Sequence, residues 1–144
     1  MHDAILTKDF NGLTAAQPAI PANWYYDPSH FELEMREILQ KQWVYVCRSD
    51  ALQKPGDYRV FEIGDQSIIV LRDNHGDIRG FYNTCRHRGS ALCTNEAGTA
   101  DRRLTCPYHQ WTYALDGRLL STGPMRAVAG FDRKEYGLFK IAVQ

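Results

Sequence analysis

Apolar and polar residues alternate in short runs along most of this chain, a pattern typical of strands joined by tight turns. Residues 58–63 and 67–72 form two such runs around Gly64 and Asp65, which predicts a β-hairpin. Further strands or short apolar runs are expected at residues 43–46, 78–82, 103–105, 111–115, 118–120 and 138–143. Strands this short and this closely spaced predict a mainly β domain of antiparallel sheets.

One helix is expected before these strands. Asp27 precedes Pro28, which is the usual order of a helix N-cap and first helical residue. The helix should end near Lys41. Its apolar residues recur at helical spacing, and we expect them to pack in a core; they are Phe31, Met35, Ile38 and Leu39.

The same pattern suggests how the chain is organised. Residues 1–23 show little periodicity and are interpreted as an N-terminal arm, and residues 24–144 as the folded domain. Gln144 follows directly on the last predicted strand, with no turn or cap after it. We therefore expect this sequence to be a piece of a longer polypeptide.

The composition limits which binding partners and which cellular compartment are expected. The 144 residues include 17 basic and 17 acidic ones, so charge gives no argument for nucleic acid or a membrane surface as a partner. No apolar run is long enough for a membrane span, and the N-terminus does not resemble a secretory signal. A cytoplasmic location is expected. Four cysteines in such a reducing compartment suggest metal binding or free thiols before disulfides.

Two cysteine–histidine pairs carry the clearest chemical signal. Cys85 and His87 are separated by one residue, Cys106 and His109 by two, and residues 88–105 lie between the pairs. Each pair follows a predicted strand, so two loops could grip one object between them. Two thiolates and two imidazoles suit either tetrahedral zinc or an iron–sulfur cluster with mixed ligands.

The spacing favours the cluster. Zinc sites mostly pair two cysteines and then two histidines, whereas here each loop supplies one of each. In a Rieske centre, two cysteines bind one iron of a 2Fe-2S cluster and two histidines bind the other. Such a site is neutral when oxidised and carries one negative charge when reduced, so it accepts an electron more readily than an all-cysteine cluster. Arg86 and Arg88 flank His87 and are expected either to favour the reduced state or to form surface contacts.

At these residues the sequence resembles a known family. The segments NTCRHRGSALC (83–93) and CPYHQWTYALDGRL (106–119) are similar to the Rieske motifs of the oxygenase component, or α subunit, of Rieske non-heme iron oxygenases. Among these, the members that oxidise quaternary ammonium compounds are the most similar in general character. The resemblance implies a Rieske domain that holds one 2Fe-2S cluster through four ligands: Cys85, His87, Cys106 and His109.

The resemblance also implies what surrounds the cluster. High-potential Rieske proteins have a serine where this chain has Trp111, so we expect a low reduction potential. Tyr113 is expected either to reach a cysteine sulfur or to pack as an ordinary strand residue. Cys93 is expected to be a buried thiol or a loop-packing residue, and Cys47 a core residue and not a ligand.

The oxygen chemistry of the family would lie outside this chain. The resemblance implies a mononuclear Fe(II) in a C-terminal domain, a flavin- and NAD(P)H-linked reductase or ferredoxin as electron donor, and a homotrimer or α3β3 assembly. The whole protein would hydroxylate or demethylate an aromatic or quaternary ammonium compound with O2, as a mono- or dioxygenase, while this segment alone would only transfer electrons. Two alternatives stay open: a free-standing Rieske-type ferredoxin, and a zinc-stapled structural module.

Overall fold

The computed structural model describes residues 18–125 and 129–144. The chain divides into two compact units, Met1–Lys41 and Gln42–Gln144, and each is described here by itself. Most of the predicted arm, residues 1–17, lies outside the described residues. The predicted domain boundary at residue 24 stays a prediction.

The N-terminal unit contains the predicted helix, α1 (Pro28–Glu37), between two 3₁₀ turns, η1 (Ala22–Tyr25) and η2 (Leu39–Lys41). The Asp27 carboxylate accepts a hydrogen bond from the Ser29 backbone N–H at 2.9 Å, which confirms the predicted N-cap. The α-helix ends earlier than expected, and the chain continues to Lys41 as a 3₁₀ turn. No helix within the described ranges is long and apolar enough to cross a membrane.

The apolar stripe of α1 does not form the expected core within this unit. Met35 is its only buried member, whereas Phe31 and Ile38 are both more than half exposed. A single ten-residue helix has no second layer of structure in its own unit against which to pack an apolar stripe.

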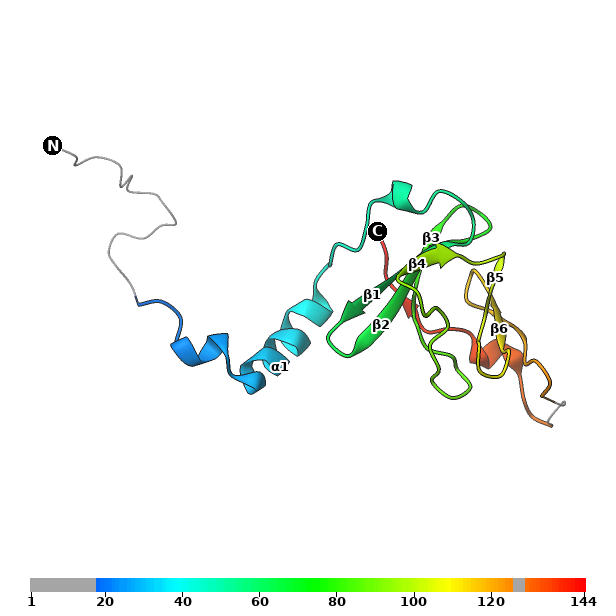
Figure 1. Ribbon diagram of the computed structural model, residues 1–144. Coiled ribbons are helices and arrows are strands. Elements are labelled where there is room, and N and C mark those ends of the chain that lie inside the picture. Colours follow the sequence, from blue (N-terminus) through cyan, green and yellow to red (C-terminus); the bar gives the residue numbers. More distant parts are fainter. Residues whose placement is uncertain (1–17, 126–128) are drawn as a thin grey trace. The chain divides into compact units, whose positions relative to one another are not determined.

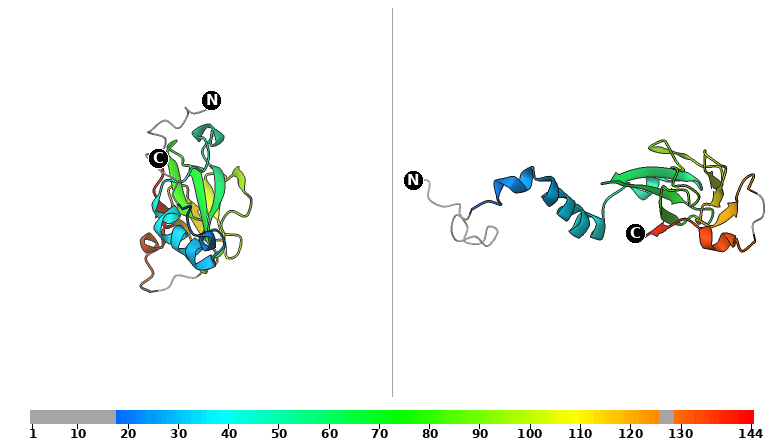
Figure 2. Two further views of the ribbon diagram at one scale, coloured as in Figure 1. Left: turned by 90° about the vertical axis from the view of Figure 1, so that its left-hand side faces the viewer. Right: turned by 90° about the horizontal axis from the view of Figure 1, so that it is seen from below.

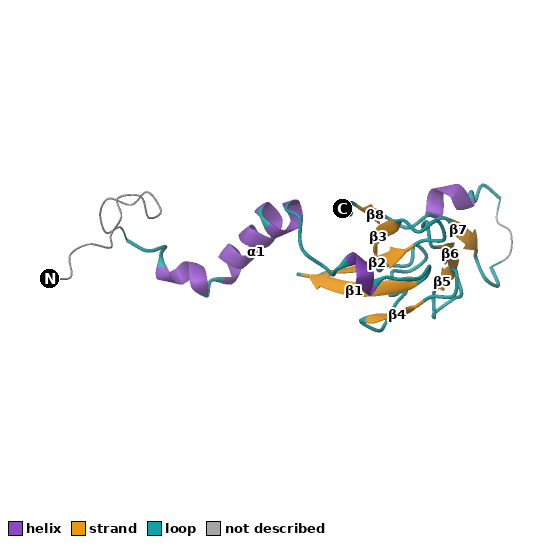
Figure 3. Cartoon of the chain, turned by 90° about the horizontal axis from the view of Figure 1, so that it is seen from above, coloured by secondary structure: helices purple, strands orange, loops and turns teal. Residues whose placement is uncertain are grey.

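The larger sheet of the second unit has five antiparallel strands in the order β4-β1-β2-β3-β8 (Figures 1 and 3). The predicted hairpin is confirmed as its centre. Its pairing places Val60 opposite Ile69. The strands are β1 (Asp57–Ile63), β2 (Gln66–Arg72), β3 (Ile78–Tyr82), β4 (Ala97–Thr99) and β8 (Lys140–Ile141), and a 3₁₀ turn, η3 (Ser49–Ala51), precedes them.

The smaller sheet has three antiparallel strands, β5 (Arg103–Thr105), β6 (Thr112–Ala114) and β7 (Leu119–Ser121). All three coincide with predicted strands to within one or two residues. The turn between β6 and β7 contains Gly117, whose φ of 90° suits glycine, and a 3₁₀ turn, η4 (Arg133–Tyr136), follows the sheet.

The structure differs from the expected strands at three places. Residues 43–46 form no strand, and Trp43 is 68% exposed. The last strand is only two residues long, because β3 offers it partners at Gly80 and Phe81 alone. β4 was not expected, since its sequence, Ala-Gly-Thr, has weak strand character; it pairs with the end of β1. Figure 2 shows the red C-terminal segment beside the green strands of the larger sheet.

The core of this unit draws on both sheets. Ile69, Leu71 and Phe81 contribute from the larger sheet, and Leu104 and Tyr113 from the smaller one. The loops that follow β3 and β5 place two of the four candidate ligands, Cys85 and Cys106, in the same buried cluster.

Candidate metal centre

Two loops with the same backbone hydrogen bonding carry the four candidate ligands. We call residues 85–90 the first finger and residues 106–111 the second finger. In the first, the Cys85 N–H donates to the Ser90 carbonyl at 2.8 Å and the Gly89 N–H to the Cys85 carbonyl at 2.9 Å. In the second, the Cys106 N–H donates to the Trp111 carbonyl at 2.8 Å and the Gln110 N–H to the Cys106 carbonyl at 3.0 Å.

Each finger turns through a residue with left-handed backbone, four positions after its cysteine. Gly89 has φ 75°, a backbone conformation that glycine adopts without strain. Gln110 occupies the same place in the second finger with φ 61°, a conformation uncommon for a residue with a side chain. The second finger is also crowded from outside, because a Cβ on Gly123 would lie 2.6 Å from the His109 carbonyl oxygen.

The two cysteines lie together and are buried, each 2% exposed. Each thiol is close enough to contribute to the pKa shift of the other. Burial raises the pKa of Cys85. Burial also acts to raise the pKa of Cys106, but the backbone N–H groups of Tyr108 and His109 outweigh it, so this pKa is lowered. Amides that favour a sulfur anion suit a thiolate ligand.

The two histidines also lie together, at the partly exposed tips of the fingers. Their ring centroids are 4.7 Å apart, edge to face. The pKa of His87 is lowered by loss of hydration and by the neighbouring His109 and Arg88, which favours the neutral imidazole that binds metals. His109 Nδ1 is buried and has no hydrogen-bond partner among the described residues.

These observations fit a cluster with two kinds of ligand. In the part of the chain that the structure describes, no three His, Cys, Asp or Glu side chains are close enough to hold one metal ion together. The donors are instead gathered as a thiol pair and an imidazole pair, each with one member from each finger. The orphaned nitrogen of His109 is a donor atom that a metal would satisfy.

Tyr113 reaches the thiol pair from β6. Its hydroxyl lies 3.4 Å from Cys85 Sγ and accepts the Arg86 backbone N–H at 3.0 Å. Tyr113 is fully buried, and burial raises its pKa, so the phenol stays protonated and can donate to sulfur. Of the two expectations for this residue, contact with a cysteine sulfur is therefore confirmed.

Aromatic rings support the histidines. Trp111 is buried and stacks on His87, with centroids 5.0 Å apart. Trp111 also meets the rings of Phe131 and Tyr136 edge to face. Tyr108, which is mostly exposed, lies against His109 at 3.7 Å. His87 is thus backed by packed protein, whereas His109 is covered by a surface side chain.

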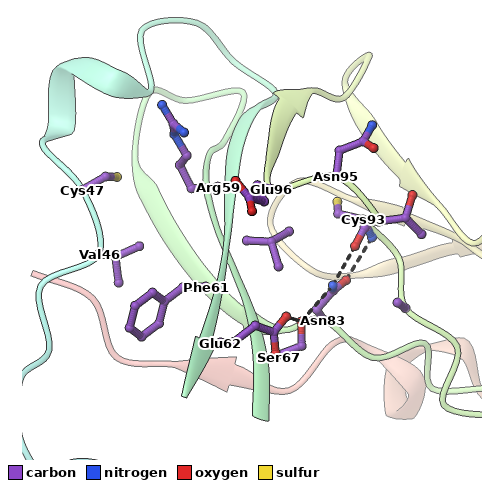
Figure 4. Close-up of a pocket in the computed structure, with 13 residues that line it drawn as sticks. Val46, Cys47, Arg59, Phe61, Glu62, Ser67, Asn83, Cys93, Asn95 and Glu96 are labelled. Carbon is purple, nitrogen blue, oxygen red and sulfur yellow. Dashed lines mark hydrogen bonds between the residues drawn. The ribbon is translucent and has the colours of Figure 1, made fainter. Parts of the chain in front are cut away.

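Asn83 lies just before the first finger and binds the chain that follows it. The sequence alone did not identify this residue. It is buried, and its carboxamide oxygen accepts the backbone N–H groups of Leu92 and Cys93, both at 2.9 Å. Its amide group donates to the Cys93 carbonyl at 2.8 Å and to Ser67 Oγ at 3.1 Å (Figure 4). Only the packing of the folded chain reveals this role.

The other two cysteines line a surface cavity and not the metal centre. The cavity, of about 720 Å³, lies between the segment at Val46, β1 and the loop near Asn95 (Figure 4). Cys93 is buried, as expected, and burial raises its pKa to about 11. Cys47 is only half-buried, because the segment that carries it forms no strand.

Comparison with known proteins agrees with this geometry. The family model described as "Rieske [2Fe-2S] domain" matches residues 42–132. The glycine betaine monooxygenase oxygenase subunit of Chromohalobacter salexigens is 46% identical over 87% of this chain. The carnitine monooxygenase oxygenase subunit of Escherichia coli K12 is 35% identical over 99% of it. The chain spans 28% of the length of the first relative and 38% of the second.

Solved structures show the same likeness. The crystal structure of the quaternary ammonium Rieske monooxygenase CntA in complex with an inhibitor matches with a TM-score of 0.81 and 33% identity, covering 86% of this chain and 34% of that one. Naphthalene 1,2-dioxygenase from Rhodococcus sp. matches with a TM-score of 0.77 and 34% identity, covering 83% of this chain and 28% of that one.

Proposed function

Because the chain belongs to the Rieske [2Fe-2S] domain family, we propose that its two fingers hold one 2Fe-2S cluster through the ligands Cys85, His87, Cys106 and His109. The observation that carries this proposal is the pairing of like donors across the fingers, with the thiols buried and the imidazoles at the tips. A zinc module is the weaker alternative, because a single zinc ion needs all its ligands around one point.

When bound, the cluster supplies a site for one electron. The chain's own residues exclude water from the sulfur side and leave the imidazole side partly exposed. We propose that electrons enter and leave through the exposed edges of His87 and His109. In this proposal a reductase or ferredoxin is the donor, and a mononuclear iron elsewhere in the whole protein is the acceptor.

The whole protein is proposed to be the oxygenase component of a monooxygenase for a quaternary ammonium compound. The names of two relatives, glycine betaine monooxygenase and carnitine monooxygenase oxygenase subunits, support this substrate class. An aromatic substrate is the second candidate, because the chain is also 37% identical over 83% of its length to the anthranilate 1,2-dioxygenase large subunit of Acinetobacter baylyi. A cytoplasmic location and a trimeric assembly belong to the same proposal.

The ligand assignment is tested with the purified chain, by absorption and EPR spectra before and after dithionite. We expect a red-brown protein that gains a rhombic signal on reduction. Cys106→Ser should abolish both, whereas Cys93→Ser, a matched change at another buried cysteine, should keep them. A colourless protein with one bound zinc would contradict the proposal.

The substrate class is tested with the whole protein and its reductase. Oxygen consumption and product mass should respond to glycine betaine or carnitine and not to anthranilate. Turnover of anthranilate alone would show that the whole protein acts on aromatic compounds and not on quaternary ammonium compounds. Electron transfer with no oxygenation of any compound would favour the free-standing ferredoxin.

A further inference from the structure

The side chain of Arg86, which lies between two proposed ligands, is held by a distant segment of the chain. Arg86 Nη1 donates to the Gly137 carbonyl at 2.7 Å. Its guanidinium carbon lies 3.9 Å from the centroid of the Phe139 ring, a cation–π contact. These contacts fix a positive charge that would otherwise move freely in water.

We call residues 137–141 the strap, and it is itself firmly attached. The Leu138 N–H donates to the Gly117 carbonyl at 2.8 Å, in the turn of the smaller sheet. The Phe139 carbonyl accepts the Tyr82 N–H at 3.1 Å, at the end of β3. The strap then pairs with β3 as β8. The strap is therefore attached to both sheets and can support the guanidinium from them.

Arg88 provides a natural comparison. It lies on the other side of His87 in the sequence and carries the same charge, but its side chain is exposed. A charge in water is screened by solvent and by salt, whereas a partly buried charge is screened much less. The two arginines should therefore differ in their effect on the proposed cluster, although each is next to the same ligand.

We propose that the strap makes Arg86 a positioning residue that raises the reduction potential of the cluster. One-electron reduction changes a ferric ion to a ferrous ion and leaves the site with one negative charge. A cation held beside the first finger stabilises that charge, so the reduced state is favoured. This inference rests on the proposed ligand assignment and adds to it a role for a residue that is not a ligand.

The test is an EPR-monitored redox titration at one fixed pH, with dithionite and mediators supplying the electron, on the purified cluster-loaded chain. Arg86→Gln should lower the midpoint potential the most. Phe139→Leu should lower it by a smaller amount, because the arginine keeps its charge but loses its support. Arg88→Gln is the matched control: the Arg88 charge also acts on His87, but it is exposed and screened by water, so this variant should shift the potential least.

Several results would overturn the inference. An equal or larger shift in Arg88→Gln would show that contact with the strap gives Arg86 no special effect on the potential. A shift in Arg86→Gln with none in Phe139→Leu would show that charge acts without the strap. A lower melting temperature with an unchanged potential in both variants would reduce Arg86 to a structural role.

Two controls keep the test decisive. If Arg86→Gln does not load a cluster, Arg86→Lys and Phe139→Leu are compared instead, and the inference requires both to lower the potential, because lysine lacks the planar guanidinium that stacks on Phe139. If the unaltered chain holds no cluster, the ligand assignment fails. A loaded chain whose variants show no shift refutes only the role of Arg86.

Discussion

Replacing Tyr113 with phenylalanine removes one oxygen atom from the buried side of the proposed cluster. That oxygen lies 3.4 Å from Cys85 Sγ and accepts the Arg86 N–H at 3.0 Å. A thiolate can only accept hydrogen bonds, so the phenol must be the donor in the loaded protein. Tyr113→Phe keeps the ring that fills the core and removes only the hydroxyl, which is both the donor to sulfur and the acceptor of the Arg86 N–H.

The expected shift in potential follows from the change in hydrogen-bond strength on reduction. A hydrogen bond to a charged group contributes about 1.5–3 kcal/mol, and we take about 1 kcal/mol as the part gained when the sulfur becomes more negative. For a one-electron couple about 1.4 kcal/mol corresponds to about 59 mV, so the potential should fall by roughly 40 mV. The unpaired Arg86 N–H should also lower the unfolding free energy by about 1–3 kcal/mol.

The assay is a redox titration of Tyr113→Phe beside the unaltered chain, with circular dichroism confirming the fold. Tyr108→Phe is the matched control, because Tyr108 is mostly exposed and lies at the histidine side. An unchanged or higher potential in Tyr113→Phe would refute the reasoning. Equal shifts in both variants would show that the effect is not specific to the sulfur contact.

Four further outcomes are expected. Cys93, whose pKa is raised to about 11, stays protonated at pH 8, so peptide mapping should find it unmodified by iodoacetamide until the protein is unfolded. Asn83→Ala removes four hydrogen bonds and should lower the unfolding free energy by about 2–4 kcal/mol in urea titrations. Both Gly89 and Gln110 have left-handed backbone, so Gly89→Ala should lower the unfolding free energy by about 1 kcal/mol, whereas Gln110→Gly should leave it unchanged or raise it. Thermal melts measure both variants. Asp73→Ala should lower the melting temperature, because the buried carboxylate accepts two backbone N–H groups and the Arg79 side chain.

The features that sequence predicted correctly are those set by neighbouring residues. Strand alternation and the turn at Gly64 placed the β1–β2 hairpin, and Asp27 with Pro28 placed the start of α1. The four proposed ligands were visible because each cysteine has its histidine two or three positions away. Ligand spacing is short for a physical reason: one finger must present both donors to one cluster.

The features that sequence missed depend on contacts between distant segments. β4 is a strand only because the end of β1 offers it partners. The left-handed backbone of Gln110 follows from the closure of the second finger and has no signature in its residue type. The apolar stripe of α1 is the opposite case: its periodicity is local, but its own unit offers no second layer of structure against which to pack.

The proposed ligands are close together in sequence, whereas the residues that support them come from distant segments. This difference has a consequence for other sites that have the same ligand motif. Arg86 lies next to two proposed ligands and contacts two of these distant supports. Its backbone N–H donates to Tyr113, 27 residues away, and its side chain donates to the Gly137 carbonyl, 51 residues away. Neither contact changes the ligand motif. Tyr113 contributes a hydrogen bond at Cys85, and in our proposal the Gly137 contact holds the Arg86 charge beside the first finger. In our proposal the four ligands hold the cluster, whereas the packing of β6 and the strap determines how readily the cluster accepts an electron. Two chains with identical fingers should differ in potential when these supports differ.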